Sequence, residues 1–535
     1  MSSQTSTLTA PVPATTYDEI PYISMPYAHS HPERLAAIAR LLGLNPPAIH
    51  HCRVLELGCA SGNNLIPIAA AYPESTFLGL DLSERQIASG KTIINTLGLK
   101  NIELRRANIM DFPPTEGKFD YIIVHGIYSW VPAEVQDKIL SICKQNLKPD
   151  GVAYVSYNVL PGWHMRGMIR DMMLHHIQRF PDPQQKLAQA RALLDFLVKA
   201  VPADNNPYGL FLKSEMELLK QQSDNYLFHD HLEENNHPIY FHEFVTRAAG
   251  KGLRYLGDSD LRTMATRDLH PDAQKLLATS LSQIETEQYM DFLRNRMFRM
   301  SLLIHDDKQH NLNIDNQILK DFYVASALRP SAPVGNLNTT DPMEFVTATG
   351  DKAGVALPLA KAVLVILAEA WPCRLPFMEL LQQAAARLGT PLPNDPAGMK
   401  QVIDAVGGPL LLLHTGLPFG VVELALGPLN VAQKSGEKPK ASPLARLQAA
   451  AGPMCNMRHQ YVQLDDFGRQ FLLLLDGTQT REQILETLVE KVRRQELVIR
   501  ENDVVVSDLN RVRAMLQAQL ENVLQILANS SLLVP

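Results

Sequence analysis

Short apolar runs alternate with helical patterns over the first 160 residues of the chain. The runs have the length of buried strands and lie at 53–57, 76–81, 102–106, 119–124 and 152–157. Helical patterns occupy 32–43 before the first run, and 63–72, 83–97 and 132–147 between later ones. Strands that alternate with helices in this rhythm are typical of βαβ units and a parallel sheet. The pattern therefore predicts an α/β domain over residues 17–165, after a Ser-, Thr- and Pro-rich tail at 1–16 that we expect to be disordered.

Longer helical patterns give the next part of the chain a different character. They lie at 165–180, 183–201, 209–222 and 281–304. Between them, residues 240–260 read as a helix, a Gly-rich stop and a short strand. Two interpretations stay open for the region 166–327. Either residues 240–260 complete the sheet, which makes 165–235 a helical insertion, or the whole region is a separate helical domain.

A segment rich in Pro, Asn and Thr at 328–343 predicts a linker to a further domain at 344–535. Helical patterns in this domain lie at 357–370, 375–388, 397–404, 480–495 and 507–528, and strand-like runs at 409–413 and 420–425. Helices combined with short strands favour an α+β domain that resembles a winged helix.

The turn after the first predicted strand carries the clearest chemical signal. The sequence "VLELGCASG" runs from Val54 to Gly62, with Glu56 at the end of the strand and glycines at 58 and 62. Glycine permits a tight turn and lets a ligand approach the backbone, and the free N–H groups of the following helix point to the same place. Because the glycines are only two and an acidic residue precedes them, the turn favours a cationic amino-acid ligand over a diphosphate.

Polar residues follow each of the other predicted strands, at the edge of the sheet where ligands of such folds bind. Asp81 ends the second strand, where a carboxylate can accept hydrogen bonds from ribose hydroxyls. Asn108 follows the third strand, His125 the fourth, and Tyr157 and Asn158 the fifth. Taken singly, Asp81 could be a helix cap and His125 a structural histidine; the combination at these intervals predicts one shared ligand site.

Composition and charge narrow the class of protein. The 535 residues carry a net charge of −6, so no basic footprint for nucleic acid is expected. The five cysteines form no CxxC pair, which favours reduced thiols and a cytoplasmic location. No apolar run approaches about 18 residues, so we expect no membrane span. We also expect no metal site, because the spacing of His229, His231, His237 and His242 matches no ligand template.

These residues resemble the class I S-adenosylmethionine-dependent methyltransferases, whose fold is a Rossmann-like α/β sheet. The acidic residue and GxxxG turn match the first motif of that family, Asp81 its ribose-binding acid, and Asn108 its adenine-contacting position, where many members carry Asp. The resemblance implies S-adenosyl-L-methionine as cofactor and predicts a set of contacts with it: Glu56, Gly58, Cys59, Ala60, Gly62, Asp81, Leu82, Asn108, Ile109 and His125.

A closer resemblance covers most of the chain. Segments such as "FDYIIVHGIYSWVP", "YVSYNVLPGW" and "YLFHDHLEENNHPIYFHEF" are similar to the rickettsial outer-membrane-protein lysine methyltransferases. That group joins a methyltransferase domain to a helical regulatory domain and a winged-helix-like region. The resemblance implies methylation of a protein lysine. A small-molecule N- or O-methyltransferase, or a protein that binds the cofactor without transferring a methyl group, stay open as alternatives, as does a homodimer.

Methyl transfer to a lysine needs a neutral amine, which an apolar aromatic pocket favours by desolvation. His125, Tyr128 and Trp130 on the loop after the fourth strand, and Tyr157 and Asn158 after the fifth, are the predicted catalytic residues. Packing between the sheet and its helices is the alternative for these aromatic side chains. The aromatic, Pro-rich segment before the domain could be a lid in which Tyr17, Tyr22 or Tyr27 touches the cofactor, or a surface strap.

Overall fold

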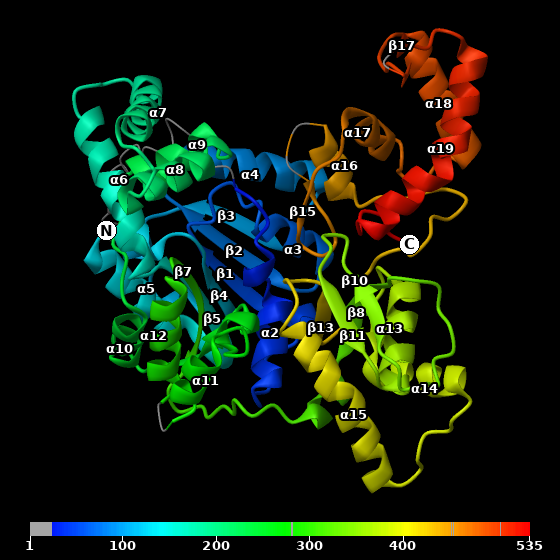
Figure 1. Ribbon diagram of the computed structural model, residues 1–535. Helices are drawn as coiled ribbons and strands as arrows, with labels where there is room; N and C mark the ends of the chain where they lie inside the picture. The colour runs from blue at the N-terminus through cyan, green and yellow to red at the C-terminus, as the bar shows by residue number, and fades with distance from the viewer. Residues whose placement is uncertain (1–23, 280–281, 451, 453, 503) are drawn as a thin grey trace, which may run out of the picture.

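The computed structural model of the chain describes residues 24–279, 282–450, 452, 454–502 and 504–535. A seven-stranded sheet of order β3-β2-β1-β4-β5-β7-β6 lies at the centre of its first 305 residues (Figure 1). The first five strands are parallel. They are β1 Arg53–Leu57, β2 Thr76–Asp81, β3 Ile102–Arg106, β4 Phe119–Val124 and β5 Leu147–Asn158.

Helices cover both faces of this sheet. Successive residues of each strand point to opposite sides, so neighbouring residues pack against different helices. Val54 of β1 packs in one core with α2 (Pro32–Leu41), α3 (Leu65–Ala71) and α4 (Glu84–Leu97). Its neighbour Leu55 packs in a second core with α5 (Ala133–Asn146) and α10 (Phe241–Ala249). The doubly wound α/β fold predicted from the alternating pattern is therefore confirmed.

Two antiparallel pairings finish the sheet. Strand β7 (Phe298–His305) lies between β5 and β6 (Leu253–Asp258) and runs antiparallel to both. Strand β6 is part of the sheet and α10 packs on one of its faces, so residues 240–260 complete the sheet, as in the first of the two interpretations. The expected helix at 281–304 ends at Arg294 with α12 (Gln283–Arg294), and the remainder is strand β7. Phe298, Met300 and Leu302 of β7 alternate with Arg299 and Ser301, a period of two that favours a strand over a helix. The helix prediction for this part of the segment is therefore wrong.

A group of helices leaves the sheet at the carboxyl end of β5. It contains α6 (Gly162–Ile177), α7 (Pro183–Ala200), α8 (Pro207–Lys220) and α9 (Asp224–Leu227), followed by one π-helical turn at Phe228–Leu232. These helices have their own apolar core, separate from the two cores of the sheet. The chain returns to the sheet at α10, so this helical insertion stands over the edge at which the parallel strands end (Figure 1). Helix α11 (Pro271–Leu277) lies between β6 and α12.

A second unit with small sheets packs against the first. Strand β8 (Tyr323–Ser326) pairs with β12 (Leu375–Pro376) and β13 (Val422–Ala425), and helices α13 (Pro358–Ala370), α14 (Phe377–Leu388) and α15 (Pro396–His414) accompany them. A hairpin sheet joins β9 (Arg329–Pro330), β10 (Met343–Val346) and β11 (Lys352–Val355).

Two expectations for this unit need correction. The strand expected at 409–413 is wrong, because these residues form the end of α15, with Pro409 inside the helix. A short apolar run does not reveal its secondary structure by periodicity alone. The segment 328–343, expected as a linker, begins in β9, and its residues Leu328 and Leu337 are buried. It is therefore packed against the unit that follows.

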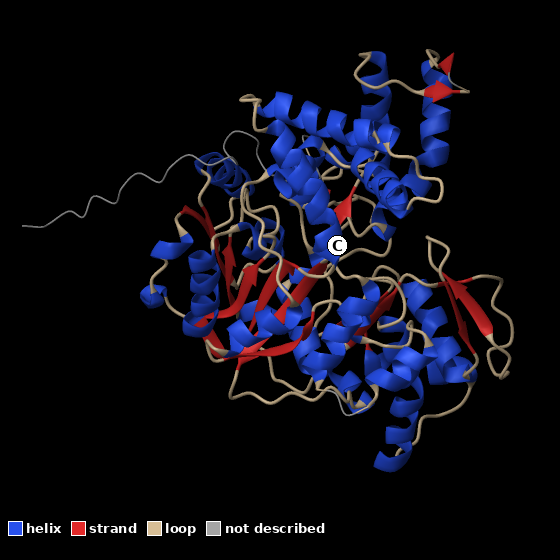
Figure 2. Cartoon of the chain, turned by 60° about the vertical axis from the view of Figure 1, so that its left-hand side comes forward, coloured by secondary structure: helices blue, strands red, loops and turns tan. Residues whose placement is uncertain are grey.

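The last hundred residues form a further helical domain with its own core. Helix α16 (Pro443–Ala449) leads into a short hairpin of β14 (Met454–Cys455) and β15 (Tyr461–Val462). Helices α17 (Asp466–Leu473), α18 (Arg481–Arg493) and α19 (Leu509–Asn529) follow, with the hairpin β16 (Arg500–Glu501) and β17 (Val504–Val505) between the last two. Figure 1 shows α16 to α19, coloured orange to red, at the upper right of the molecule, and Figure 2 shows the end of the chain, marked C, near the middle of the view.

Candidate active site

The turn between β1 and α3 has the backbone that its glycines predict. Gly58 and Gly62 have φ of +67° and +75°, and Ala60 between them has φ of +47°. A Cβ on Gly58 would lie 1.9 Å from Ile127 Cδ1, so the turn is closely packed there. The backbone N–H of Ala60 donates to Asp81 Oδ2 at 2.8 Å. The carboxylate at the end of β2 thus holds the turn that follows β1.

A cavity of about 1200 Å³ opens over this turn, at the carboxyl ends of the parallel strands. Most of the residues predicted to bind the cofactor line it: Glu56, Gly58, Cys59, Ala60, Asp81, Leu82, Asn108, Ile109 and His125. Gly62 is not among the lining residues; it packs under the turn, where a Cβ would lie 2.9 Å from Leu104. Tyr22, also predicted to touch the cofactor, lies outside the described residues, as does Tyr17.

Glu56 presents a carboxyl group that is only half satisfied by the protein. Asn64 Nδ2 donates to its Oε1 at 2.7 Å, whereas Oε2 is buried without a hydrogen-bond partner among the described residues. Burial raises the pKa of Glu56 to about 7. A buried acceptor of this kind is costly unless a ligand pairs with it. An ammonium group is the partner that its chemistry suits.

The imidazole of His125 lies deep in the same cavity. Its Nδ1 is 2.9 Å from the hydroxyl of Tyr154, and its ring stacks on that of Tyr27 with centroids 3.7 Å apart. Burial lowers the pKa of His125 to about 3, so the ring is neutral at physiological pH. It offers a flat apolar surface with one polar edge rather than a cation.

Two of the predicted catalytic residues lie away from the cavity. Tyr128 and Tyr157 are each 1% exposed and pack against Phe244 of α10. The hydroxyl of Tyr157 lies 2.8 Å from Ser301 Oγ of β7. The catalytic prediction for these two tyrosines is therefore corrected: they belong to the core, as the packing alternative allowed. Tyr157 lies within strand β5, so it faces the opposite side from its neighbour Asn158.

Trp130 and Asn158 do line the cavity, and the helical insertion adds a second wall that the motif analysis did not single out. The rings of Trp130 and Trp163 meet edge to face, with centroids 6.0 Å apart. Polar and aromatic residues of the insertion that line the same space are Arg166, Tyr226, Phe228, His229, Asp230 and Glu233. Most of these lie in the segment "YLFHDHLEENN", whose acidic and aromatic character was the available signal.

The histidines of this segment make ordinary hydrogen bonds or are simply buried. His229 Nδ1 lies 3.0 Å from Glu233 Oε1, and His242 Nδ1 lies 2.9 Å from Gln288 Oε1. Within the described part of the chain, no group of three or more His, Cys, Asp or Glu side chains is placed to hold a metal ion.

The residues around the turn fit a sulfonium nucleoside that carries an amino acid. Glu56 Oε2 suits the ammonium group of such a ligand. The positive-φ turn lets the ligand come close to the protein backbone, and Asp81 is placed to accept hydrogen bonds from its ribose hydroxyls. Residues 50–236 match the family model "Methyltransferase domain", residues 223–305 "Predicted methyltransferase regulatory domain", and residues 437–532 "PKMT, C-terminal winged helix domain". Fold and site define a class I S-adenosylmethionine-dependent methyltransferase.

Solved structures and a sequence relative extend this likeness over nearly the whole chain. PKMT2 from Rickettsia typhi in complex with AdoHcy superposes with a TM-score of 0.87 at 33% identity, covering 96% of this chain and 100% of that one. A second structure of PKMT2 gives a TM-score of 0.85 at 32% identity, with the same coverage. A Rickettsia prowazekii protein is 35% identical over 97% of this chain and 93% of its own length. The chain belongs to the PKMT family of these rickettsial proteins.

Family membership agrees with the three-part order predicted from the sequence, namely methyltransferase, regulatory and winged-helix regions. The winged-helix match covers 437–532, so it corresponds to the domain of α16 to α19 rather than to the unit of β8 to β13. In the described residues, no helix is both long enough and apolar enough to cross a bilayer.

Proposed function

We propose that this methyltransferase acts on the side-chain amine of a lysine in a polypeptide. The observation that carries the proposal is the second wall of the cavity, where acidic and aromatic side chains of the helical insertion stand together. Asp230 and Glu233 line it with Trp130, Trp163 and Phe228. Carboxylates and aromatic faces are the groups that attract an alkylammonium ion. The names of the rickettsial relatives, which include "PKMT", agree with this choice of acceptor.

The size of the cavity supports an acceptor that enters beside the cofactor. Its volume of about 1200 Å³ exceeds the ~300–1,000 Å³ that is usual for a pocket that holds one small ligand. A lysine side chain is long and thin, so it reaches a buried methyl donor while its own backbone stays outside. An open chamber of this size accommodates both partners at once.

The walls of the cavity act on the protonation of the amine. A lysine ammonium must lose a proton before it can act as a nucleophile, and burial against Trp130, Trp163 and Phe228 favours the neutral form. Asp230 is a half-buried carboxyl group of this wall, and desolvation raises its pKa to about 6. It faces Arg166, His229 and Tyr226. Above pH 6 it is a carboxylate, so it can take the proton that the ammonium loses and then hold the neutral amine by a hydrogen bond.

The other side chains of the site hold the two partners in place. When bound, S-adenosylmethionine supplies the methyl group. Asn158, which lines the cavity, donates from Nδ2 to Asn236 Oδ1 at 3.0 Å, and this bond fixes its side chain. Neutral His125 presents a flat surface without a charge that would repel the sulfonium. Alignment of this kind, rather than acid–base chemistry alone, supplies much of the gain in rate.

The test is incubation of the pure protein with methyl-labelled S-adenosylmethionine and a cell extract. We expect label in the protein fraction and, after hydrolysis, in methylated lysine. Label confined to small molecules would contradict the proposal in favour of a small-molecule N- or O-methyltransferase. Cofactor binding without any label transfer would leave a binding protein. Asp81→Ala, which removes the carboxylate that holds the turn, is the inactive control.

A variant of Asp230 tests the acceptor wall separately from cofactor binding. Asp230→Asn should lower kcat by about 100-fold, since correctly placed proton-handling groups contribute ~10²–10⁴, and should leave the Kd for S-adenosylhomocysteine unchanged. The matched control is Asp171→Asn on α6, whose side chain is 80% exposed. Equal activity of the two variants would contradict the assignment of Asp230. The cytoplasmic location and the homodimer stay predictions from the sequence.

A further inference from the structure

The turn between β14 and β15 of the C-terminal domain reaches Asn64, a residue that lines the cofactor cavity. Asn456 Oδ1 accepts hydrogen bonds from the backbone N–H groups of Arg458 and Gln460, each at 2.9 Å. This turn holds His459 at a φ of +58°. A residue with a Cβ persists in that conformation only where the surrounding structure enforces it. The imidazole of His459, only 4% exposed, is directed by this turn toward the start of α3.

His459 makes a hydrogen bond to Asn64, which directly precedes α3. The distance from His459 Nε2 to Asn64 Oδ1 is 2.8 Å, and the same oxygen accepts from the backbone N–H of Tyr27 at 2.9 Å. Because an amide oxygen only accepts, Nε2 of His459 carries the proton. Burial lowers the pKa of His459 to about 3, so the ring is neutral and its Nδ1 is bare. Nδ1 faces the thiol of Cys455, 3.8 Å away.

The donors around Asn64 Oδ1 determine which way its amide group points. Besides Tyr27 and His459, the hydroxyl of Ser30 lies 3.4 Å from this oxygen, and the same hydroxyl accepts from Asn64 Nδ2 at 3.0 Å. With the oxygen held by Tyr27 and His459, the Nδ2 group turns toward Glu56 and donates to Oε1 at 2.7 Å. If the amide turned over, its oxygen would face a carboxylate and repel it. The orientation of Asn64 therefore sets one oxygen of Glu56 and leaves Oε2 for the ligand.

We propose that His459 is a positioning residue for S-adenosylmethionine, acting through Asn64 on Glu56, so that the winged-helix domain is part of the cofactor site. His459 and Asn64 are 395 positions apart in the sequence. Their hydrogen bond continues from Asn64 to the carboxylate of Glu56 beside the glycine turn. This role concerns cofactor binding alone. It holds whichever acceptor is methylated, so it stands or falls independently of the proposed function.

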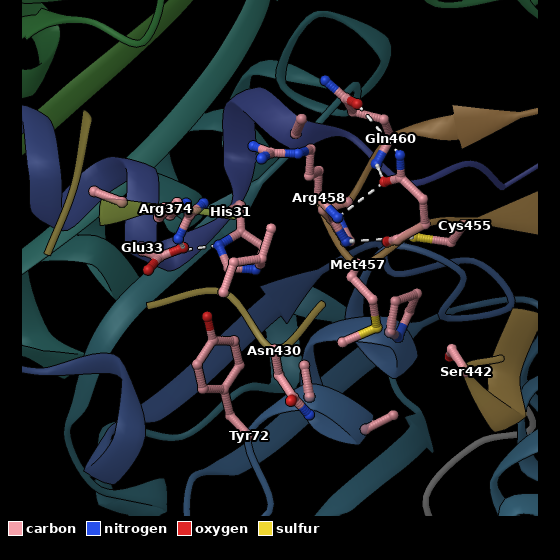
Figure 3. Close-up of a pocket in the computed structure, with 18 of the residues that line it drawn as sticks. His31, Glu33, Tyr72, Arg374, Asn430, Ser442, Cys455, Met457, Arg458 and Gln460 are labelled. Atoms are coloured by element: carbon pink, nitrogen blue, oxygen red, sulfur yellow. Dashed lines mark hydrogen bonds and ion pairs between the residues drawn. The ribbon is translucent and has the colours of Figure 1, made fainter. Parts of the chain in front are cut away.

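The hairpin that carries His459 is anchored by ion pairs to the rest of the protein. Arg458 pairs with Glu423, which also meets Arg374, and Arg374 Nη1 lies 2.8 Å from Glu33 Oε2 of α2. A second cavity of about 580 Å³ lies beside these side chains. Figure 3 shows Arg458, Met457 and Gln460 on one side of it and His31, Glu33 and Tyr72 on the other. His459 lines this space as well.

The experiment measures the Kd for S-adenosylmethionine and for S-adenosylhomocysteine by calorimetry in the full-length protein. His459→Leu removes the donor and should weaken both by about 3- to 10-fold, the usual range for one hydrogen bond. His459→Gln keeps an N–H donor near the same place and should restore most of the affinity. Met457→Leu, in the same turn but outside the chain of hydrogen bonds, is the matched control and should bind as the wild type does.

A double-mutant cycle separates this role from a merely structural one. In an Asn64→Ala background, His459→Leu should have little further effect, because the link to Glu56 is already broken. An equal loss in both backgrounds would overturn the proposal, and so would wild-type affinity in His459→Leu or an equal loss in His459→Gln. Should His459→Leu fail to fold, His459→Asn, whose shorter amide does not reach Asn64, takes its place with the same expectations.

Discussion

The ring of Tyr27 lies on the ring of His125, with their planes inclined by 27°. Tyr27 belongs to the segment before α2, whereas His125 follows β4, so two distant parts of the chain meet over the cofactor cavity. Of the two interpretations of this segment, a lid or a surface strap, this contact supports the lid. The imidazole of His125 is buried between the rings of Tyr27 and Tyr154. Burial disfavours a charge on the imidazole, so the ring stays neutral there.

Tyr27→Ala should therefore weaken cofactor binding, because it removes one wall of the cavity and the stacking that holds His125. We expect a Kd for S-adenosylmethionine higher by about 3- to 10-fold, in line with the worth of an aromatic pair. Tyr27→Phe keeps the ring and should stay close to the wild type. Calorimetry measures the Kd of both variants, and an unchanged affinity in Tyr27→Ala would contradict the interpretation of this segment as a lid.

Gly58→Ala tests the glycine turn against a matched glycine elsewhere. Gly58 and Gly98 have the same φ of +67°, but a Cβ at Gly98 would have nothing within 4 Å, whereas one at Gly58 would meet Ile127. Both substitutions should lower the melting temperature, since the left-handed conformation costs a residue with a Cβ about 1–2 kcal/mol. Only Gly58→Ala should also lose cofactor affinity, by about 10-fold or more. An equal loss of affinity in Gly98→Ala would show that the effect is general.

The raised pKa of Glu56 predicts how pH couples to cofactor binding. With a pKa of about 7 when folded and an ordinary value of 4.5, the carboxyl group binds more protons in the folded than in the unfolded state between these limits. The stability of the ligand-free protein should therefore fall as pH rises from about 4.5 to 7. A bound ammonium favours the ionised form, so the stabilisation given by S-adenosylhomocysteine should be larger at pH 8 than at pH 6.

Thermal unfolding with and without S-adenosylhomocysteine at these pH values checks the Glu56 prediction. The titratable groups that face Glu56 are Asp81 on β2, the thiol of Cys59 and the phenol of Tyr154, and burial raises the pKa of the last two so that both stay neutral. Glu56→Gln is the control and should abolish most of the pH dependence. If the dependence persists in Glu56→Gln, it belongs to the ligand or to Asp81.

Arg299 holds the regulatory region to the sheet and predicts a large effect on stability. Its guanidinium lies 2.8 Å from both Asp291 and Glu287 of α12, and all three side chains are at most 3% exposed. Arg299→Met leaves these carboxylates buried without their partner, which costs about 3–5 kcal/mol. Arg105→Met on β3 breaks a half-exposed pair with Glu103 and should cost about 0–1 kcal/mol. Denaturant unfolding compares them; similar losses would contradict the burial argument.

The sequence predicts the parallel part of the sheet well because the central strands β1 and β4 are almost fully buried and read as apolar runs. The edge strand β3, IELRR, is mostly not buried and is predicted from its place in the alternating order. The boundaries of β1, β2, β3 and β4 agree with those predicted. Strand β7 is missed because the helical pattern of α12 is extended past Asn295, which ends the helix in the left-handed conformation. The alternation of Phe298, Met300 and Leu302 with polar residues is the signal that identifies the strand. The run at 409–413 shows the reverse error, where an apolar end of a helix looks like a strand.

The candidate site is predictable where side chains follow a strand directly and less so where the end of the strand is uncertain. Glu56, Asp81, Asn108 and His125 line the cavity as their spacing predicts. Tyr157 does not, because β5 runs on to Asn158 and the alternation of side chains turns the tyrosine into the core. His459 has no local signal at all, since its partner Asn64 is remote in the sequence and only the packing of domains brings them together.

The hydrogen bond between His459 and Asn64 forms late in the synthesis of the protein, because one of its partners lies near the C-terminus. Synthesis runs from the N-terminus at about 5–20 residues per second, so the glycine turn leaves the ribosome well before the hairpin of β14 and β15 does. A nascent chain has the turn but lacks the histidine that orients Asn64 until residue 459 has emerged. From the proposed role of His459 we expect affinity for the methyl donor to reach its final value only near the end of translation.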